Sequence, residues 1–318
     1  MSRVYTTFVI TLYNTKIMGS EGLQERYINP YTDFGFKKLF GTDMNKDLLI
    51  SFLNALLHGE QTVKDITYLN TEHLGTLEID RRAVFDVYCE NEQGEKFLVE
   101  MQKGEQQFFK DRSLFYSTFP IREQAVKGRS WDYELKAVYT IGILNFVFDN
   151  KDDNYYHHEV KLLDTRTKEV FYNKLTFIYL EMPKFNKTEA ELETMFDKWM
   201  FVLRNLSVLM ERPAALQERV FERLFKSAEI AGFSKQELFE YEDSLKVFRD
   251  WYSVVKTAAD KGFTEGFGEG FGEGFGEGFG EGEKKKQLEI AQNLKSLGIA
   301  IDVIAQSTHL SQEEIEKL

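Results

Sequence analysis

The chain has 318 residues, and its 42% hydrophobic content with 28 phenylalanines suffices for one large domain or two smaller ones. A formal net charge of −12 argues against tight nonspecific binding to nucleic acid, because such binding depends on neutralising phosphates. The single cysteine, Cys89, excludes an internal disulfide and a cysteine-based zinc site. No run of 18 apolar residues occurs, so we expect no membrane span and a cytoplasmic protein.

The N-terminal residues come before the first segment whose sequence pattern predicts a helix or a strand. We expect residues 1–26 to be a disordered extension, with translation starting at either Met1 or Met18. Residues 1–17 lack the basic region and cleavage site of a secretory signal. Apolar periodicity next predicts two helices and a strand, at residues 29–41, 45–58 and 63–69 respectively.

Two β-rich runs, 83–90 and 95–102, flank a turn that contains asparagine and glycine, which predicts an antiparallel hairpin. A turn centred near Gln93 places Asp86 opposite Glu100, where Cβ atoms lie about 4.5–5.5 Å apart. The two like charges would repel each other there. A divalent cation between them would turn that repulsion into coordination, and carboxylate oxygens suit Mg²⁺ or Mn²⁺. Gln102 projects from the same strand face as Glu100.

Acidic residues of a hairpin are often simply solvated, so the flanking residues matter. Here the neighbours of both acids are apolar on either side, which is typical of strands buried on both faces. An ionised carboxylate in such a strand is costly unless it is paired or bound to metal. The sequence therefore favours a metal site at Asp86 and Glu100.

The next segments indicate a helix between two strands. A helix at 106–126 carries Arg112 and Tyr116 one turn apart, and Pro120 is expected to break or kink it. A strong strand follows at 135–148, so the pattern predicts a parallel crossover. The remaining expected elements are strands at 160–163 and 175–180 and helices at 189–210, 214–231 and 235–257, the last one with a capping box of Ser234 and Glu237.

Residues 262–282 repeat a Gly-Phe-Gly-Glu unit with period four. A helix would stack the phenylalanines into an oligomerisation stripe. Glycine, however, costs about 1 kcal/mol per residue in a helix, and i,i+4 contacts return only a few tenths. We favour a flexible linker in an isolated monomer, which association could convert to helix. Short helices at 283–297 and 301–306 and a capping box at Ser311 follow, a tail better suited to self-association or docking than to reading DNA.

One ordered set of residues is similar to a known family: Asp33-x-x-Phe36-Lys37-x-x-Phe40, Asp86, Glu100-Met101-Gln102, Arg112 with Tyr116, and Tyr133-Glu134-Leu135. Over residues 27–260 the chain resembles the PD-(D/E)XK nuclease family transposases, also called the Rpn family of recombination-promoting nucleases. The resemblance implies an α/β, restriction-endonuclease-like fold in which helices flank a mixed sheet. It also implies a Mg²⁺-dependent DNA endonuclease, with Mn²⁺ as a possible substitute.

The resemblance assigns roles to individual residues. Asp86 and Glu100 would hold the metal, with Asp33 completing the coordination directly or through water. The DNA-binding residues that the resemblance implies are Lys37, Arg112 and Tyr116. The usual motif ends in Glu-x-Lys, whereas here Gln102 stands in place of the lysine. A glutamine can orient a water molecule but cannot serve as a general base. The adjacent Lys103 would project from the opposite strand face.

The sequence thus predicts five parts in chain order: an extension at 1–26, a nuclease-like core at 27–185, a helical region packed on it at 186–260, a Gly-rich linker at 261–282 and a helical tail at 283–318. The expected partners are DNA and further copies of the chain in a homo-oligomer. The alternative is a catalytically weak or inactive nuclease fold that serves as a DNA- or protein-docking module. Metal-dependent cleavage discriminates between the two.

Overall fold

A computed structural model describes residues 25–59, 62–70, 72–73, 83–104, 107–125, 132–148, 152, 154–297 and 299–318, with backbone alone for 72–73, 83–84, 263, 265–281 and 283. Most of the expected N-terminal extension therefore lies outside the described residues. The chain divides into two compact units, Met1–Arg249 and Asp250–Leu318. No helix in the described part is both long enough and apolar enough to cross a bilayer.

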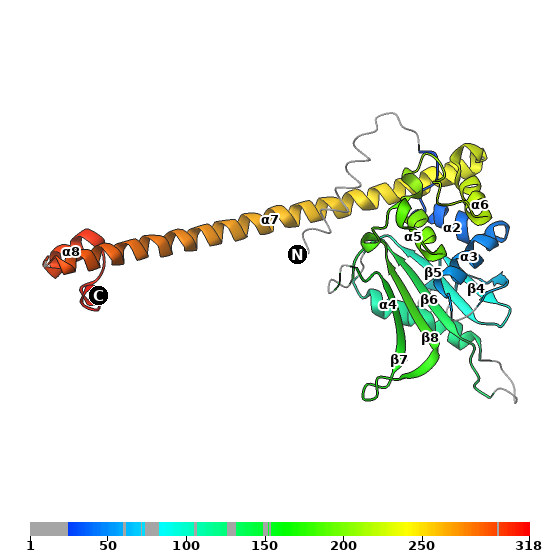
Figure 1. The fold of residues 1–318 in the computed structure, drawn as a ribbon, viewed down its shortest axis with the longest axis horizontal. Coiled ribbons are helices and arrows are strands. Elements are labelled where there is room, and N and C mark those ends of the chain that lie inside the picture. The colour runs from blue at the N-terminus through cyan, green and yellow to red at the C-terminus, as the bar shows by residue number, and fades with distance from the viewer. Residues whose placement is uncertain are drawn as a thin grey trace. The chain divides into compact units, whose positions relative to one another are not determined.

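The first unit is built on a mixed six-stranded sheet in the order β1-β4-β5-β6-β8-β7 (Figure 1). β5, β6 and β8 run parallel, and the other neighbouring pairs are antiparallel. The strands are β1 (Ile66–Tyr68), β4 (Val87–Asn91), β5 (Lys96–Gln102), β6 (Val138–Leu144), β7 (His157–Leu163) and β8 (Val170–Glu181), and a separate pair consists of β2 (Glu72–His73) and β3 (Ala83–Val84). This mixed α/β architecture is consistent with the restriction-endonuclease-like fold that the sequence implied.

The β4–β5 hairpin has the register that its turn predicts. Asn91 Oδ1 accepts hydrogen bonds from the backbone N–H groups of Gln93 at 3.1 Å and Glu95 at 2.9 Å. Gly94 takes a positive φ of 78°, a conformation that glycine adopts without steric cost. Val87 pairs with Val99 in the antiparallel register, so Asp86, one residue before Val87, lies opposite Glu100, one residue after Val99. The turn chemistry alone thus brings residues 86 and 100 opposite each other.

Helix α4 (Phe109–Glu123) forms the expected crossover between the parallel strands β5 and β6. Its residues Phe109 and Phe119 join an aromatic-rich core on one face of the sheet, with Tyr88, Leu98, Leu144 and Tyr179 among the strand residues. Pro120 lies within the helix, which ends three residues later at Glu123. The proline removes one helical hydrogen bond, yet the helix continues for three more residues, so the expected break does not occur at Pro120 itself.

Four helices form the layer on the other side of the sheet from α4 (Figure 1). They are α2 (Asp33–Phe40), α3 (Lys46–Leu56), α5 (Met195–Asn205) and α6 (Arg219–Ala228). The buried Trp199 of α5 joins them, because its ring lies 5.2–5.8 Å from those of Phe40, Phe52 and Phe221. Short 3-10 helices connect the elements: Asp43–Asn45, Met182–Lys184, Glu189–Glu191, Leu206–Val208 and Ile230–Gly232.

Helix α7 (Lys235–Ser296) begins at the predicted capping box, in which Ser234 N donates to Glu237 Oε2 at 2.9 Å. Its backbone remains helical through residues 262–282, which differs from the flexible linker that the glycine content favoured. The difference has a cooperative origin. Strong helix formers lie on both sides of the repeat, so each repeat residue extends an existing helix and does not have to nucleate a new one.

The second unit contains a small core of its own. Helices α8 (Ile301–Thr308) and α9 (Gln312–Glu316) follow α7. They bury Ala291, Ile304, Leu310 and Ile315 together. The predicted capping box at Ser311 is present, with Ser311 N donating to Glu314 Oε2 at 3.0 Å.

Candidate active site

Asp86 and Glu100 face each other at the open end of the β4–β5 hairpin. Asp86 occupies the bend directly before β4, and Glu100 lies inside β5. Asp86 Oδ2 accepts a hydrogen bond from the backbone N–H of Met101 at 2.8 Å, one residue beyond Glu100. The aspartate therefore both ends the ladder between the strands and directs its carboxylate toward β5.

The two carboxyl groups resist being charged together. Burial and the neighbouring Asp86 raise the pKa of Glu100 to about 7, although Arg112 and the hydrogen bond from Gln102 act in the opposite direction. Burial also raises the pKa of Asp86, partly offset by the Met101 N–H. Coupled carboxyl groups with raised pKa values are typical of functional sites, because an ordinary fold has no reason to retain them.

The side-chain amide of Gln102 links Glu100 to helix α4. Its Nε2 donates to Glu100 Oε2 at 2.8 Å, and its Oε1 accepts a hydrogen bond from Arg112 Nη2. A guanidinium can only donate and a carboxylate can only accept, so these two partners fix which end of the amide faces which group. Arg112 therefore contacts the acidic pair through the Gln102 amide.

Tyr116 lies one helical turn beyond Arg112. The guanidinium carbon of Arg112 is 5.7 Å from the centroid of the Tyr116 ring, which in turn packs edge-on against Phe85 at 5.3 Å. Burial raises the pKa of the Tyr116 hydroxyl, and the negative charges of Glu100 and Asp86 add to the shift. Both α4 residues that the sequence singled out thus lie beside the acidic pair.

Helix α2 brings Asp33 and Lys37 within electrostatic range. Asp33 raises the pKa of Asp86 and Lys37 lowers it. Lys37 Nζ also pairs with Asp33 Oδ1 at 3.1 Å. Among the described residues, however, no group of three or more His, Cys, Asp or Glu side chains is placed to hold a metal ion. The structure thus assembles Asp86 and Glu100 as a pair, with Asp33 acting on it through charge.

Lys103 directly follows β5. A regular strand would project it to the face opposite Glu100 and Gln102. Lys103 lines a groove with residues of α2 and α7, whereas Gln102 contacts Arg112 of α4. The charge of Lys103 acts on Asp86 and lowers the pKa of that carboxyl.

Two further neighbours of Glu100 come from distant strands. Gly142 of β6 is its partner in the parallel register, and Tyr179 of β8 is the partner of Gly142. The hydroxyl of Tyr179 donates to Ser113 Oγ of α4 at 2.8 Å. Burial, together with the charge of Glu100, raises the pKa of Tyr179. Nothing in the local sequence indicates these neighbours, because they depend on how β5, β6 and β8 align.

A groove of about 620 Å³ lies between α2 and the first turns of α7. Its lining includes Asp33, Lys37 and Lys103, the three residues whose charges act on Asp86. The groove also contains acids from α7, such as Glu237 and Glu240, so its charge is mixed.

Comparison with known proteins gives a family for this arrangement. The model of the PD-(D/E)XK nuclease family transposases matches residues 30–258, well over half of the chain. No curated protein and no solved structure matches the chain. The matched region contains the six-stranded sheet, the acidic pair and α4 together. The chain belongs to the PD-(D/E)XK nuclease family transposases.

Proposed function

We propose that the protein is a Mg²⁺-dependent DNA endonuclease of the transposase-like, recombination-promoting kind, with Mn²⁺ as a possible substitute. The observation that carries this proposal is the facing pair of Asp86 and Glu100, joined through the Gln102 amide to Arg112. The pair supplies hard oxygen ligands, and the amide and guanidinium stand next to it on the same side of the sheet.

The donor set suits a divalent cation. Two carboxyl groups in one partly buried site disfavour their ionised forms, as the raised pKa of about 7 for Glu100 indicates. A cation held by Asp86 and Glu100 would remove that repulsion, with Asp33 contributing through water. When bound, Mg²⁺ would polarise the scissile phosphate and favour ionisation of a water.

The remaining residues would position the substrate and the attacking water. The Gln102 amide has two N–H groups, and donating one of them to Glu100 leaves the other for a water molecule. Arg112 would contact a phosphate oxygen, and Tyr116 would pack beside it. Lys37 and Lys103 would contact the DNA backbone along the groove.

Cleavage of a supercoiled plasmid with Mg²⁺, Mn²⁺ or a chelator tests the proposal. Nicked or linear product with either metal, and none with chelator, supports it. Asp86→Ala should lose cleavage, whereas Glu90→Ala is a matched control. Glu90 is an acid of the same hairpin that pairs with Lys96 and takes no part in the site. Equal cleavage by both variants would refute the assigned site.

The alternative function is a DNA- or protein-docking module with a weak or inactive nuclease site. Gln102 favours it, because glutamine stands where the usual motif has a charged lysine. Binding of DNA with no cleavage in either metal would support this alternative.

We also propose that residues 262–318 direct assembly into a homo-oligomer, since the repeat offers no group suited to phosphate chemistry beyond spaced glutamates.

A further inference from the structure

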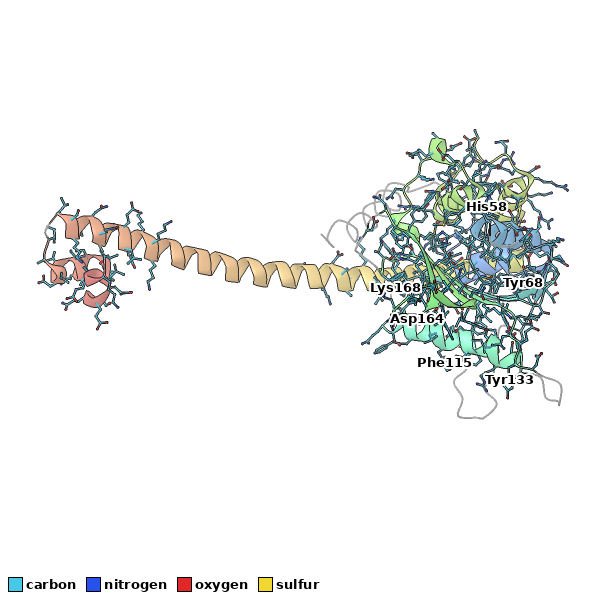
Figure 2. The ribbon with its side chains drawn as sticks, turned by 60° about the horizontal axis from the view of Figure 1, so that its bottom comes forward. His58, Tyr68, Phe115, Tyr133, Asp164 and Lys168 are labelled. Carbon is cyan, nitrogen blue, oxygen red and sulfur yellow. The ribbon has the colours of Figure 1, made fainter. Side chains whose placement is uncertain are left out.

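Two exposed aromatic side chains, one directly before α4 and one within it, have no part in the proposed chemistry. Phe108 directly precedes the helix and is 67% exposed, and Phe115 within the helix is 44% exposed. Figure 2 shows Phe115 on the outer side of the globular unit. Large apolar side chains in solvent next to a candidate active site are informative, because binding sites commonly expose such surface.

Both aromatic residues lie close to Arg112 along the chain of α4. The backbone N–H of Arg112 donates to the carbonyl oxygen of Phe108 at 2.9 Å, so the two residues lie one turn apart. Phe115 follows Phe108 by seven residues, which is close to two full turns. Its ring lies 6.3 Å from the ring of Tyr116. The exposed rings therefore flank the arginine that reaches Gln102.

Phe108 is also held in an unfavourable backbone conformation. Its φ of 63° and ψ of 29° are left-handed. Bulky residues rarely adopt this region, because the side chain approaches the following carbonyl too closely. With two thirds of the side chain in solvent, burial offsets little of this strain. Strained residues that persist in this way cluster at binding and catalytic sites.

We propose that Phe108 and Phe115 stack on unpaired bases of the DNA strand whose backbone Arg112 holds. The inference rests on the proposed function and names its substrate class: DNA with a single-stranded segment at the cleavage site. Aromatic rings need access to the face of a base, which an intact duplex hides within its own stack. Each stacked base strengthens binding roughly 5- to 150-fold.

The charge of the chain agrees with this source of affinity. Binding to duplex DNA comes largely from phosphate neutralisation, and a net charge of −12 weakens that contribution. Stacking on an aromatic ring does not require positive charge. An acidic nuclease therefore gains more from unpaired bases than from a continuous duplex.

Fluorescence anisotropy with the full-length protein in chelator measures binding separately from cleavage. The probes are a labelled single-stranded oligonucleotide and the same strand in a duplex. We expect tighter binding of the single strand, weakened roughly 5-fold or more by Phe108→Ala or Phe115→Ala, with duplex binding unchanged. Phe108→Tyr should bind as the wild type does, because it keeps an aromatic ring.

Two further variants guard against effects on folding. Phe108→Gly removes the ring and suits the positive φ, so it should fold at least as stably as the wild type and still lose affinity for the single strand. Phe171→Ala removes a ring of β8 that is 80% exposed and should leave binding unchanged.

The outcomes separate the two proposals. Phe-dependent binding of the single strand without cleavage in any metal would overturn the endonuclease but support the stacking. Metal-dependent cleavage together with unchanged single-strand binding by Phe108→Ala and Phe108→Gly would overturn the stacking alone. Equal affinity of the wild type for the two probes would also overturn it.

Discussion

Glu100 lies directly beside Gly142 in the parallel pair of β5 and β6, where the glycine leaves room for a ring from the next strand. A Cβ atom built at position 142 would lie 3.1 Å from Tyr179 Cδ1 and 3.2 Å from Leu144 Cδ2. The surface next to the acidic pair is therefore shaped by a missing side chain.

Replacing that glycine should disturb both stability and the site. Gly142→Val adds three carbons where the first already crowds its neighbours. We expect a loss of about 1–3 kcal/mol in the free energy of unfolding, measured by urea denaturation. Because Tyr179 would have to move, metal-dependent cleavage should also fall. A free energy of unfolding equal to that of the wild type would mean that the Tyr179 ring can adopt another position without cost.

The acidic pair should be essential to cleavage and dispensable for folding. Asp86→Ala and Glu100→Ala each remove ligands that the other residue cannot replace, so we expect no metal-dependent DNA cleavage from either. Circular dichroism and thermal unfolding should show a folded protein in both cases, because the two carboxyl groups disfavour each other's charge. Cleavage at the wild-type rate by purified Asp86→Ala would remove that residue from the mechanism.

The raised pKa of Glu100 predicts how stability depends on pH without metal. The unfolded chain releases this proton near its ordinary value of 4.5, whereas the folded protein holds it until about pH 7. The folded state thus binds more protons between these values, so its stability falls as pH rises through them, by up to about 3 kcal/mol. Glu100→Gln should lose this part of the slope in urea denaturation from about pH 4 to 8.

Bound Mg²⁺ should reverse this pH dependence of the folding stability. Ligand carboxylates must be ionised, so Mg²⁺ should raise the unfolding temperature more at pH 8 than at pH 6. Cleavage should decline below about pH 7 for the same reason. An equal effect of Mg²⁺ at both pH values in the wild type would mean that Glu100 is not a ligand.

Gln102→Ala should slow cleavage less than Asp86→Ala does. The substitution removes a link between Glu100 and Arg112 but leaves both metal-binding carboxylates in place. Positioning effects of this kind are about 10²–10⁴-fold at most. Single-turnover rates at saturating Mg²⁺ provide the measurement. If the two variants were equally inactive, Gln102 would have to be essential for binding the metal.

Truncation after Asp260 should separate assembly from chemistry. The six-stranded sheet and the acidic pair lie in the unit that ends at Arg249, so cleavage per site should be retained. Sedimentation should show a smaller oligomer than the full-length chain forms. Unchanged oligomeric state combined with lost activity would place the tail in the active machinery.

The hairpin was predictable because its information is local. Asn91 and Gly94 set the turn, the turn sets the register, and the register sets Asp86 against Glu100. The apolar flanks similarly indicated a buried pair of strands. Local chemistry of this kind acts over a few residues, and sequence patterns record it directly.

Other features depend on distances along the chain that no local pattern covers. The place of Gly142 and Tyr179 beside Glu100 follows from the alignment of three parallel strands. The helical backbone of the repeat depends on the helices at its two ends, so a sum of residue preferences within the repeat favoured the linker.

The hydrogen bond from Met101 N–H to Asp86 bears on how this protein could change by mutation. Asparagine has a side-chain oxygen that could accept the same bond, yet it carries no charge with which to hold a cation. A single base change converts an aspartate codon to an asparagine codon. A lineage could therefore lose cleavage in one step while the hairpin stays closed, and descendants would be free to keep the scaffold for binding alone.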